Sequence, residues 1–90
     1  MKAEEIIEEL QDVARQIGVT VRFEKGDFEG GYCVLRDQHL VLINKRLMPS
    51  RKASTLALAL QNIGLETVFL KPAIRQFIED EAVKASREAR

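Results

Sequence analysis

The stretch YCVLRDQHLVLIN, residues 32–44, holds two β-rich runs on either side of the polar pair Asp37-Gln38. Two such runs around a short polar pair predict a β-hairpin. Asp-Gln is a poorer turn dipeptide than Asn-Gly, so the pattern does not fix the loop length. The run Leu40–Ile43 is apolar on both faces. It therefore predicts a central strand covered on both sides, or a strand whose second face is an interface.

The residues before the hairpin predict a helix followed by a further strand. Between residues 2 and 17, apolar side chains recur at helical spacing on one face and acidic side chains fill the opposite face. Gly18 provides the stop expected just past a helix. The segment VTVRFE, residues 19–24, alternates apolar and polar residues, as a strand with one solvated face does.

Two more helices are predicted after the hairpin. The first opens at MPS, residues 48–50, where Pro49 suits the first turn and Ser50 is a candidate cap, and it ends at Gly64. The second begins at Pro72, and the dense charges of residues 83–90 predict a frayed C-terminal end.

Together these elements predict an α+β fold in a single domain, residues 1–90. The order is a helix, a three-stranded antiparallel sheet, then two helices packed mainly on one face of the sheet. Antiparallel pairing is expected because the connections between the strands are too short for a helical crossover.

Composition limits the classes of protein to which the chain can belong. Lys+Arg and Asp+Glu each number 14, so the net charge is zero and no overall field favours nucleic acid or acidic lipid. A single Cys and a single His exclude a disulfide framework and a Cys/His zinc site. No apolar run is long enough to span a bilayer, and the acidic start of the chain is not typical of a signal peptide. We therefore expect a cytoplasmic protein with no metal, no other cofactor and no membrane partner.

Three segments together resemble a known family: GGYC at residues 30–33, VLIN at 41–44 and STLALALQN at 54–62. In order and spacing they are similar to the compact zinc metallopeptidases of the ImmA/IrrE kind. In that family a glycine-rich hairpin ends in an Ile-x-Ile-Asn-like strand and leads to a helix bearing Ala-His-Glu-Leu-x-His. The resemblance covers residues 1–80 and implies a zincin-like fold. The chain also resembles small bacterial proteins of unknown function that share GGYC, NKRL (residues 44–47) and KPAxR (residues 71–75).

The residues that perform this family's chemistry are absent from the matching positions. The resemblance places Leu58 at the first histidine, Ala59 at the glutamate and Asn62 at the second histidine. In the family's helix the two histidines hold zinc and the glutamate activates a water molecule. Leucine and alanine do neither, asparagine is a poor zinc ligand, and His39 alone cannot assemble a site. We therefore expect a degenerate metallopeptidase fold that is not an enzyme.

Leu58, Leu40 and Leu42 are the candidate interaction residues. Leu58 lies on the polar face of its predicted helix, so it meets either another element of the chain or a partner. One interpretation is that the last helix covers it. The other is a self-association patch formed by Leu58 and the exposed side of Leu40–Ile43. A non-catalytic interaction domain, acting as a homodimer or on a protein partner, is the leading hypothesis.

Lys45, Arg46, Arg51 and Lys52 are the candidate residues of an alternative function. They cluster around the start of a helix, where backbone donors and the helix dipole favour an anionic ligand or the phosphates of RNA. A solvated loop, or a patch paired with the acidic first helix, accounts for the same residues. No RNA-binding signature lies beside the cluster, so nucleic acid is the less favoured partner.

Cys33 and His39 are the one pair that suggests a nucleophile and a base. The predicted hairpin places Cys33 opposite a residue near Lys45 rather than opposite His39. Cysteine inside a strand most often acts as a small buried hydrophobic residue. His39, beside the turn, is expected to be exposed to solvent.

Overall fold

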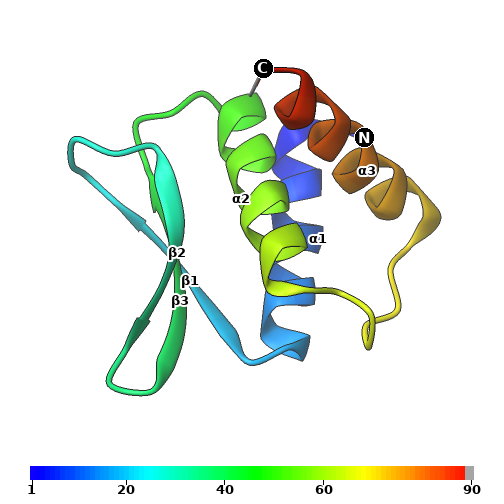
Figure 1. Cartoon of the computed structure of the whole chain (residues 1–90). Helices are drawn as coiled ribbons and strands as arrows, with labels where there is room; N and C mark the ends of the chain where they lie inside the picture. Colours follow the sequence, from blue (N-terminus) through cyan, green and yellow to red (C-terminus); the bar gives the residue numbers. More distant parts are fainter. Residues whose placement is uncertain (89–90) are drawn as a thin grey trace.

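The computed structural model describes residues 1–88 and has three layers (Figure 1). A three-stranded sheet forms the first layer, α1 and α2 cover one face of it, and α3 packs on α2 and α1 from the far side. The predicted α+β class, with its helices on one face of the sheet, is confirmed. The elements are α1 (Ala3–Gln16), β1 (Val19–Glu24), β2 (Gly30–Leu35), β3 (Gln38–Asn44), α2 (Pro49–Ile63) and α3 (Pro72–Glu88).

The sheet is mixed, so the prediction of a purely antiparallel sheet is wrong in this detail. The strand order is β1-β3-β2, with β3 antiparallel to β2 and parallel to β1. A parallel pair needs a crossover of a dozen or more residues between its strands. Residues 25–37, which include β2, provide this return, so no crossover helix is required.

The two faces of the sheet differ in what covers them. Val41 and Ile43 of β3 point to the helices and are fully buried, and Val21 and Phe23 of β1 pack against the same core. Leu40 and Leu42 point to the opposite face because side chains alternate along a strand. No helix of residues 1–88 covers that face (Figure 1). We call the two faces the helix side and the open side.

The hairpin turn lies one residue before the predicted one. Arg36 and Asp37 are its central residues, with φ of 51° and 65°. Positive φ at both positions is the geometry of a type I′ turn, whose twist suits a hairpin. This turn pairs Leu35 with Gln38 and therefore Cys33 with Leu40. The prediction that Cys33 lies opposite a residue near Lys45 is wrong.

Asn44, at the end of β3, joins two loops. Its side-chain amide donates hydrogen bonds to the carbonyl oxygens of Gly26 (2.9 Å) and Phe28 (2.8 Å). Its side-chain oxygen accepts a hydrogen bond from the backbone N–H of Arg46 at 3.0 Å. The loop between β1 and β2 is thereby fixed to the loop that leads into α2.

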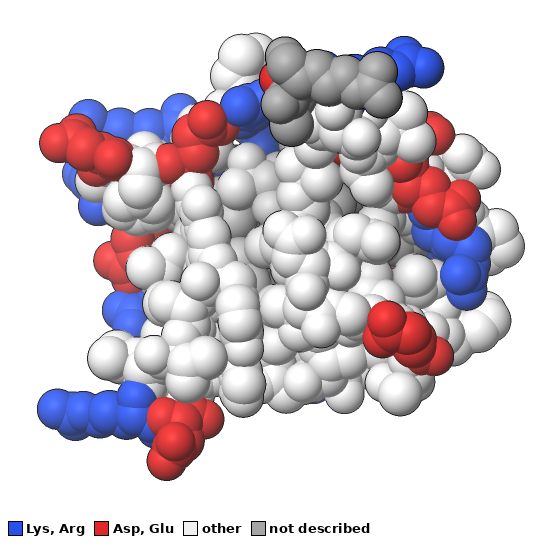
Figure 2. All heavy atoms as spheres, in the orientation of Figure 1, with Lys and Arg blue, Asp and Glu red and all other residues white. Residues whose placement is uncertain are grey.

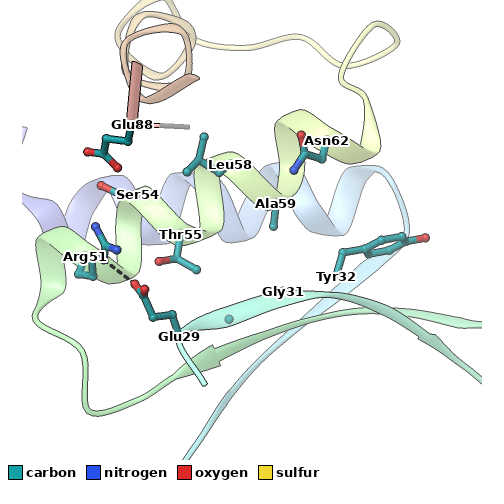
Figure 3. Close-up of a pocket in the computed structure, with 11 residues that line it drawn as sticks. Glu29, Gly31, Tyr32, Arg51, Ser54, Thr55, Leu58, Ala59, Asn62 and Glu88 are labelled. Atoms are coloured by element: carbon teal, nitrogen blue, oxygen red, sulfur yellow. Dashed lines mark hydrogen bonds and ion pairs between the residues drawn. The ribbon is translucent and has the colours of Figure 1, made fainter. Parts of the chain in front are cut away.

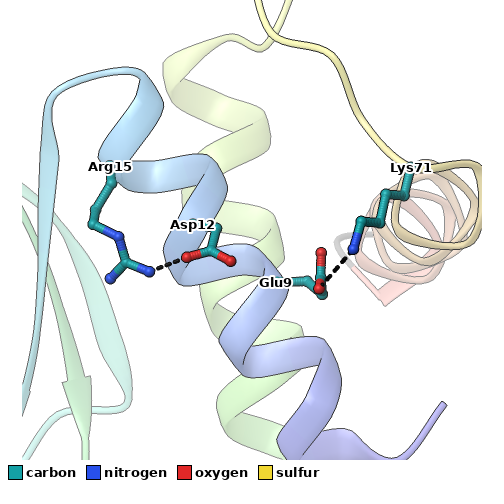
Figure 4. Close-up of polar contacts among 4 residues, drawn as sticks. All are labelled: Glu9, Asp12, Arg15 and Lys71. Atoms are coloured by element: carbon teal, nitrogen blue, oxygen red, sulfur yellow. Dashed lines mark hydrogen bonds and ion pairs between the residues drawn. The ribbon is translucent and has the colours of Figure 1, made fainter.

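Two ion pairs involve the exposed face of α1 (Figure 4). Lys71, just before α3, bonds Glu9 at 2.9 Å and so links α3 to α1. Arg15 pairs with Asp12 one turn away. None of the four basic candidates is among these partners, so the interpretation of a basic cluster paired with the acidic first helix is not what the structure shows.

Helix α3 extends to Glu88, and residues 89–90 lie outside the described residues. The frayed end at 83–90 therefore stays a prediction. Of the helices in residues 1–88, none combines the length and apolar character needed to cross a lipid bilayer.

The N-terminus of α2 lacks a side-chain cap, and the prediction of Ser50 as the cap is wrong. Met48 is the N-cap residue, with an extended backbone (φ −62°, ψ 150°) and a side chain that is 73% exposed. Pro49 occupies the first turn as predicted. The backbone N–H groups of Ser50 and Arg51 thus have no capping oxygen from residue 48.

Met48→Ser is expected to raise the free energy of unfolding by about 1 kcal/mol, because a serine oxygen accepts one of these N–H groups. Urea denaturation followed by circular dichroism measures the change. Met48→Ala is the matched control, since it removes the same side chain without adding an acceptor. Equal stability of the two variants would show that the helix end gains nothing from a cap.

Candidate functional site

Leu58 lies in a groove between α2 and β2, which we call the α2–β2 groove (Figure 3). The groove has a volume of about 300 Å³ and is lined by Thr55 and Leu58 of α2 and by Gly30, Gly31 and Tyr32 of β2, with further α2 residues and Glu88. Thr55 and Ala59 point down to β2, whereas Leu58 points toward the gap between α2 and α3. Leu58 is half-buried and also lines a hollow with Glu81, Lys84 and Ala85 of α3, so α3 covers it only in part.

One end of the α2–β2 groove is closed by an ion pair. Nε of Arg51 donates to a carboxylate oxygen of Glu29 at 2.6 Å. This hydrogen bond, together with the charge of Arg51, lowers the pKa of Glu29 below its ordinary value, and Glu29 raises the pKa of Arg51 in return. Both side chains are exposed, so the pair adds little stability.

Leu40 and Leu42 line a shallow hollow on the open side of the sheet. Leu40 is 4% exposed and Leu42 is half-buried. Cys33, Val34 and Leu35 of β2 and Phe28 of the preceding loop also line this hollow, which we call the open-side hollow. Arg22 and Glu24 of β1, paired at 2.8 Å, form its far rim.

The structure does not bring the three candidate leucines into one patch. Leu58 lies on the helix side of the sheet, whereas Leu40 and Leu42 lie on the open side. The expected single patch of Leu58 with Leu40–Ile43 is therefore wrong in geometry. Strand β2 nevertheless lines both places, so the α2–β2 groove and the open-side hollow flank the same edge of the sheet.

Strand β2 is the feature that the sequence reasoning missed. It is an edge strand, and all six of its residues are exposed. Tyr32, Val34 and Leu35 are among the large apolar side chains that remain most exposed in the fold. The signal in the sequence is that GGYCVL, residues 30–35, contains no charged residue.

The four basic candidates do not form one site. Arg51 pairs with Glu29, and Nζ of Lys52 lies 5.8 Å from the centre of the Phe23 ring on the β1 side of the helix. Lys45 and Arg46 are exposed in the loop before α2. Arg51 and Lys52 thus have different partners, and anion binding by the four basic residues stays a prediction.

Cys33 and His39 do not form a nucleophile and base pair. Cys33 is exposed, not buried as expected, and lies opposite Leu40 on the open side. His39 is exposed as expected and faces the helix side, where its Nδ1 shares a hydrogen bond with the hydroxyl of Tyr32. The two rings are stacked with their centroids 5.8 Å apart.

The positions that the resemblance matches to the metallopeptidase motif, Leu58, Ala59 and Asn62, all line the α2–β2 groove. Their side chains provide no set of zinc ligands. Within residues 1–88, no three His, Cys, Asp or Glu side chains gather closely enough to hold a metal ion. A scan of protein-family models, a search of curated proteins and a search of solved structures found no match to this chain.

Proposed function

We propose that this chain is a non-catalytic interaction domain that associates with a second copy of itself along the β2 side of its sheet. The observation that supports the proposal is the state of β2, an edge strand that is exposed throughout and contains no charge. Exposed, uncharged edge strands are templates for pairing with another chain. The apolar residues Leu58, Leu40 and Leu42 flank this edge.

A reducing compartment such as the cytoplasm is part of the proposal. Cys33 is exposed and is the single cysteine of the chain, and unpaired exposed thiols persist where glutathione keeps them reduced. We propose no metal and no cofactor, because no three His, Cys, Asp or Glu side chains of residues 1–88 gather closely enough to hold a metal ion.

Leu58→Lys is expected to weaken self-association by about 10-fold or more while leaving the monomer folded, because it places a charge in the α2–β2 groove beside the pairing edge. Sedimentation equilibrium measures the dissociation constant, and circular dichroism confirms the fold. Gln61→Lys is the matched control, since Gln61 adds the same charge to the same helix outside this groove. Unchanged association together with lost stability would make Leu58 an ordinary core residue and would count against the proposal.

A further inference from the structure

We infer that two copies join edge to edge, with β2 of each copy antiparallel to β2 of the other and Tyr32 at the two-fold axis, so that six strands form one continuous sheet. This inference rests on the proposed self-association and specifies its geometry. The partner at this edge is a second copy of the same chain.

The free hydrogen-bonding groups of β2 follow from its pairing with β3. The two-residue turn makes Leu35 and Gln38 a hydrogen-bonded pair, and the backbone N–H of Asn44 donates to the carbonyl of Glu29 at 2.8 Å. In an antiparallel ladder every second residue points its backbone groups to the same neighbour. The N–H and C=O groups of Gly30, Tyr32 and Val34 therefore point outward from the sheet.

The two edges of the sheet differ in their protection against pairing. Natural edge strands are commonly blocked by charges, proline or bulges. Strand β1, at one edge, contains the charged residues Arg22 and Glu24. Strand β2, at the other edge, contains no charge, no proline and no bulge. A symmetric β2 pair uses this unprotected edge in both copies, so the assembly closes at two chains.

The Tyr32-centred register is favoured by the number of backbone hydrogen bonds that it forms. With Tyr32 opposite itself, Gly30 lies opposite Val34 of the second copy, and all the outward backbone groups of β2 are paired. Gly31 then lies opposite Cys33 of the second copy, which places a small residue beside a larger one. A shift that puts Cys33 on the axis sets Gly30 opposite Arg36, a turn residue with φ of 51°, so the outward groups of Gly30 lose their partner.

The surfaces beside the edge fit such a partner. Residues opposite one another in a sheet point to the same side, so Val34 of the second copy lies on the helix side next to Gly30 and the α2–β2 groove that contains Leu58. Residues 53–63 of α2 contain no charge. In Figure 2 charged side chains gather at the rim, and the central surface in front of α2 is formed by uncharged residues.

A disulfide tests the register directly. In the Tyr32-centred pair, residue 31 of one copy and Cys33 of the other form a non-hydrogen-bonded pair, whose Cα atoms lie about 4.5 Å apart. That separation suits a disulfide. Gly31→Cys is tolerated by the monomer because no atom lies within 4 Å of an added Cβ. Oxidised glutathione is the added oxidant. It accepts the two electrons and two protons that the two thiols lose and becomes two molecules of reduced glutathione.

We expect Gly31→Cys to form a covalent dimer on non-reducing gels at least 10 times faster than Thr20→Cys. Thr20→Cys is the matched control, because it adds a second thiol to the open side at the opposite edge. Adding Cys33→Ser to Gly31→Cys should abolish the cross-link. Equal rates for the two variants, or rapid cross-linking of the unmodified chain through Cys33 alone, would overturn the Tyr32-centred register.

A second variant separates this inference from the proposed function. Val34 is 53% exposed, and Val34→Pro removes an outward N–H at an edge position where proline is tolerated. Two such bonds are lost per dimer, so the dissociation constant should rise about 10- to 100-fold, while Val34→Thr, which keeps the N–H, leaves it near the original value. A dimer that withstands Val34→Pro would overturn edge pairing and leave self-association standing. A chain that is monomeric without any substitution would overturn both.

Discussion

Gly30→Ala is expected to lower the free energy of unfolding by about 3 kcal/mol, the upper end of the cost of overpacking a core. An added Cβ at Gly30 would lie 2.6 Å from the carbonyl oxygen of Leu42 and 2.7 Å from Cγ2 of Thr55. The first of these atoms is backbone of β3 and cannot move without breaking the sheet. The second fixes how closely α2 approaches β2. Glycine at this position is what allows the helix and the strand to lie in contact.

Gly31→Ala is the matched control for this variant, because Gly31 is the next residue of the same strand and has open space at its Cβ position. We expect its stability to stay within about 0.5 kcal/mol of the original chain. Urea denaturation, followed by circular dichroism at one fixed protein concentration, compares the two. Similar losses in both variants would mean that the effect comes from strand propensity and not from the close packing of α2 on β2.

Asn44→Ala is expected to lower the free energy of unfolding by about 2–3 kcal/mol, because three side-chain hydrogen bonds are lost at about 1 kcal/mol each. The two carbonyl oxygens of Gly26 and Phe28 lose their donor, and the loop before α2 loses its acceptor. The loop between β1 and β2 should become more accessible to proteases, since Asn44 fixes it to the end of β3.

Asn44→Asp separates the two hydrogen bonds that Asn44 donates from the one that it accepts. Aspartate keeps an acceptor for the N–H of Arg46 but loses both donors and places a negative charge beside two carbonyl oxygens. It should therefore be no more stable than Asn44→Ala at neutral pH. An alanine variant within 0.5 kcal/mol of the original chain, measured by urea denaturation, would show that Asn44 does not hold the loops together.

The order of the elements is predictable from local pattern, whereas the order of the strands is not. Helical spacing in residues 2–17 and alternation in residues 19–24 predict α1 and β1 to within one residue. The parallel pairing of β1 with β3 depends on β2 acting as the return, which is a property of the whole sheet. The turn at Arg36-Asp37 cannot be located from the sequence, because neither residue is the Gly or Asn that positive φ usually selects.

The candidate site is only partly predictable, because its geometry also depends on the arrangement of the whole sheet. The sequence identifies Leu58, Leu40 and Leu42 as candidates because each is apolar where a solvated face is expected. In the structure each of them lies beside β2. Leu40 and Leu42 lie on the side of the sheet away from Leu58 because Val41 and Ile43 are the β3 residues that pack on the helices, a tertiary contact that the local pattern does not determine. The strand order makes β2 an edge strand. Its lack of charge indicates a pairing surface only when its position at the edge is known.

The molar mass in solution, measured by light scattering with refractive-index detection at two protein concentrations, tests self-association most directly. Refractive index is the right detector because the chain has one Tyr and no Trp, so its absorbance is weak. Self-association predicts a mass near twice the 10.2 kDa of one chain at the higher concentration. A mass of one chain at both concentrations would contradict it.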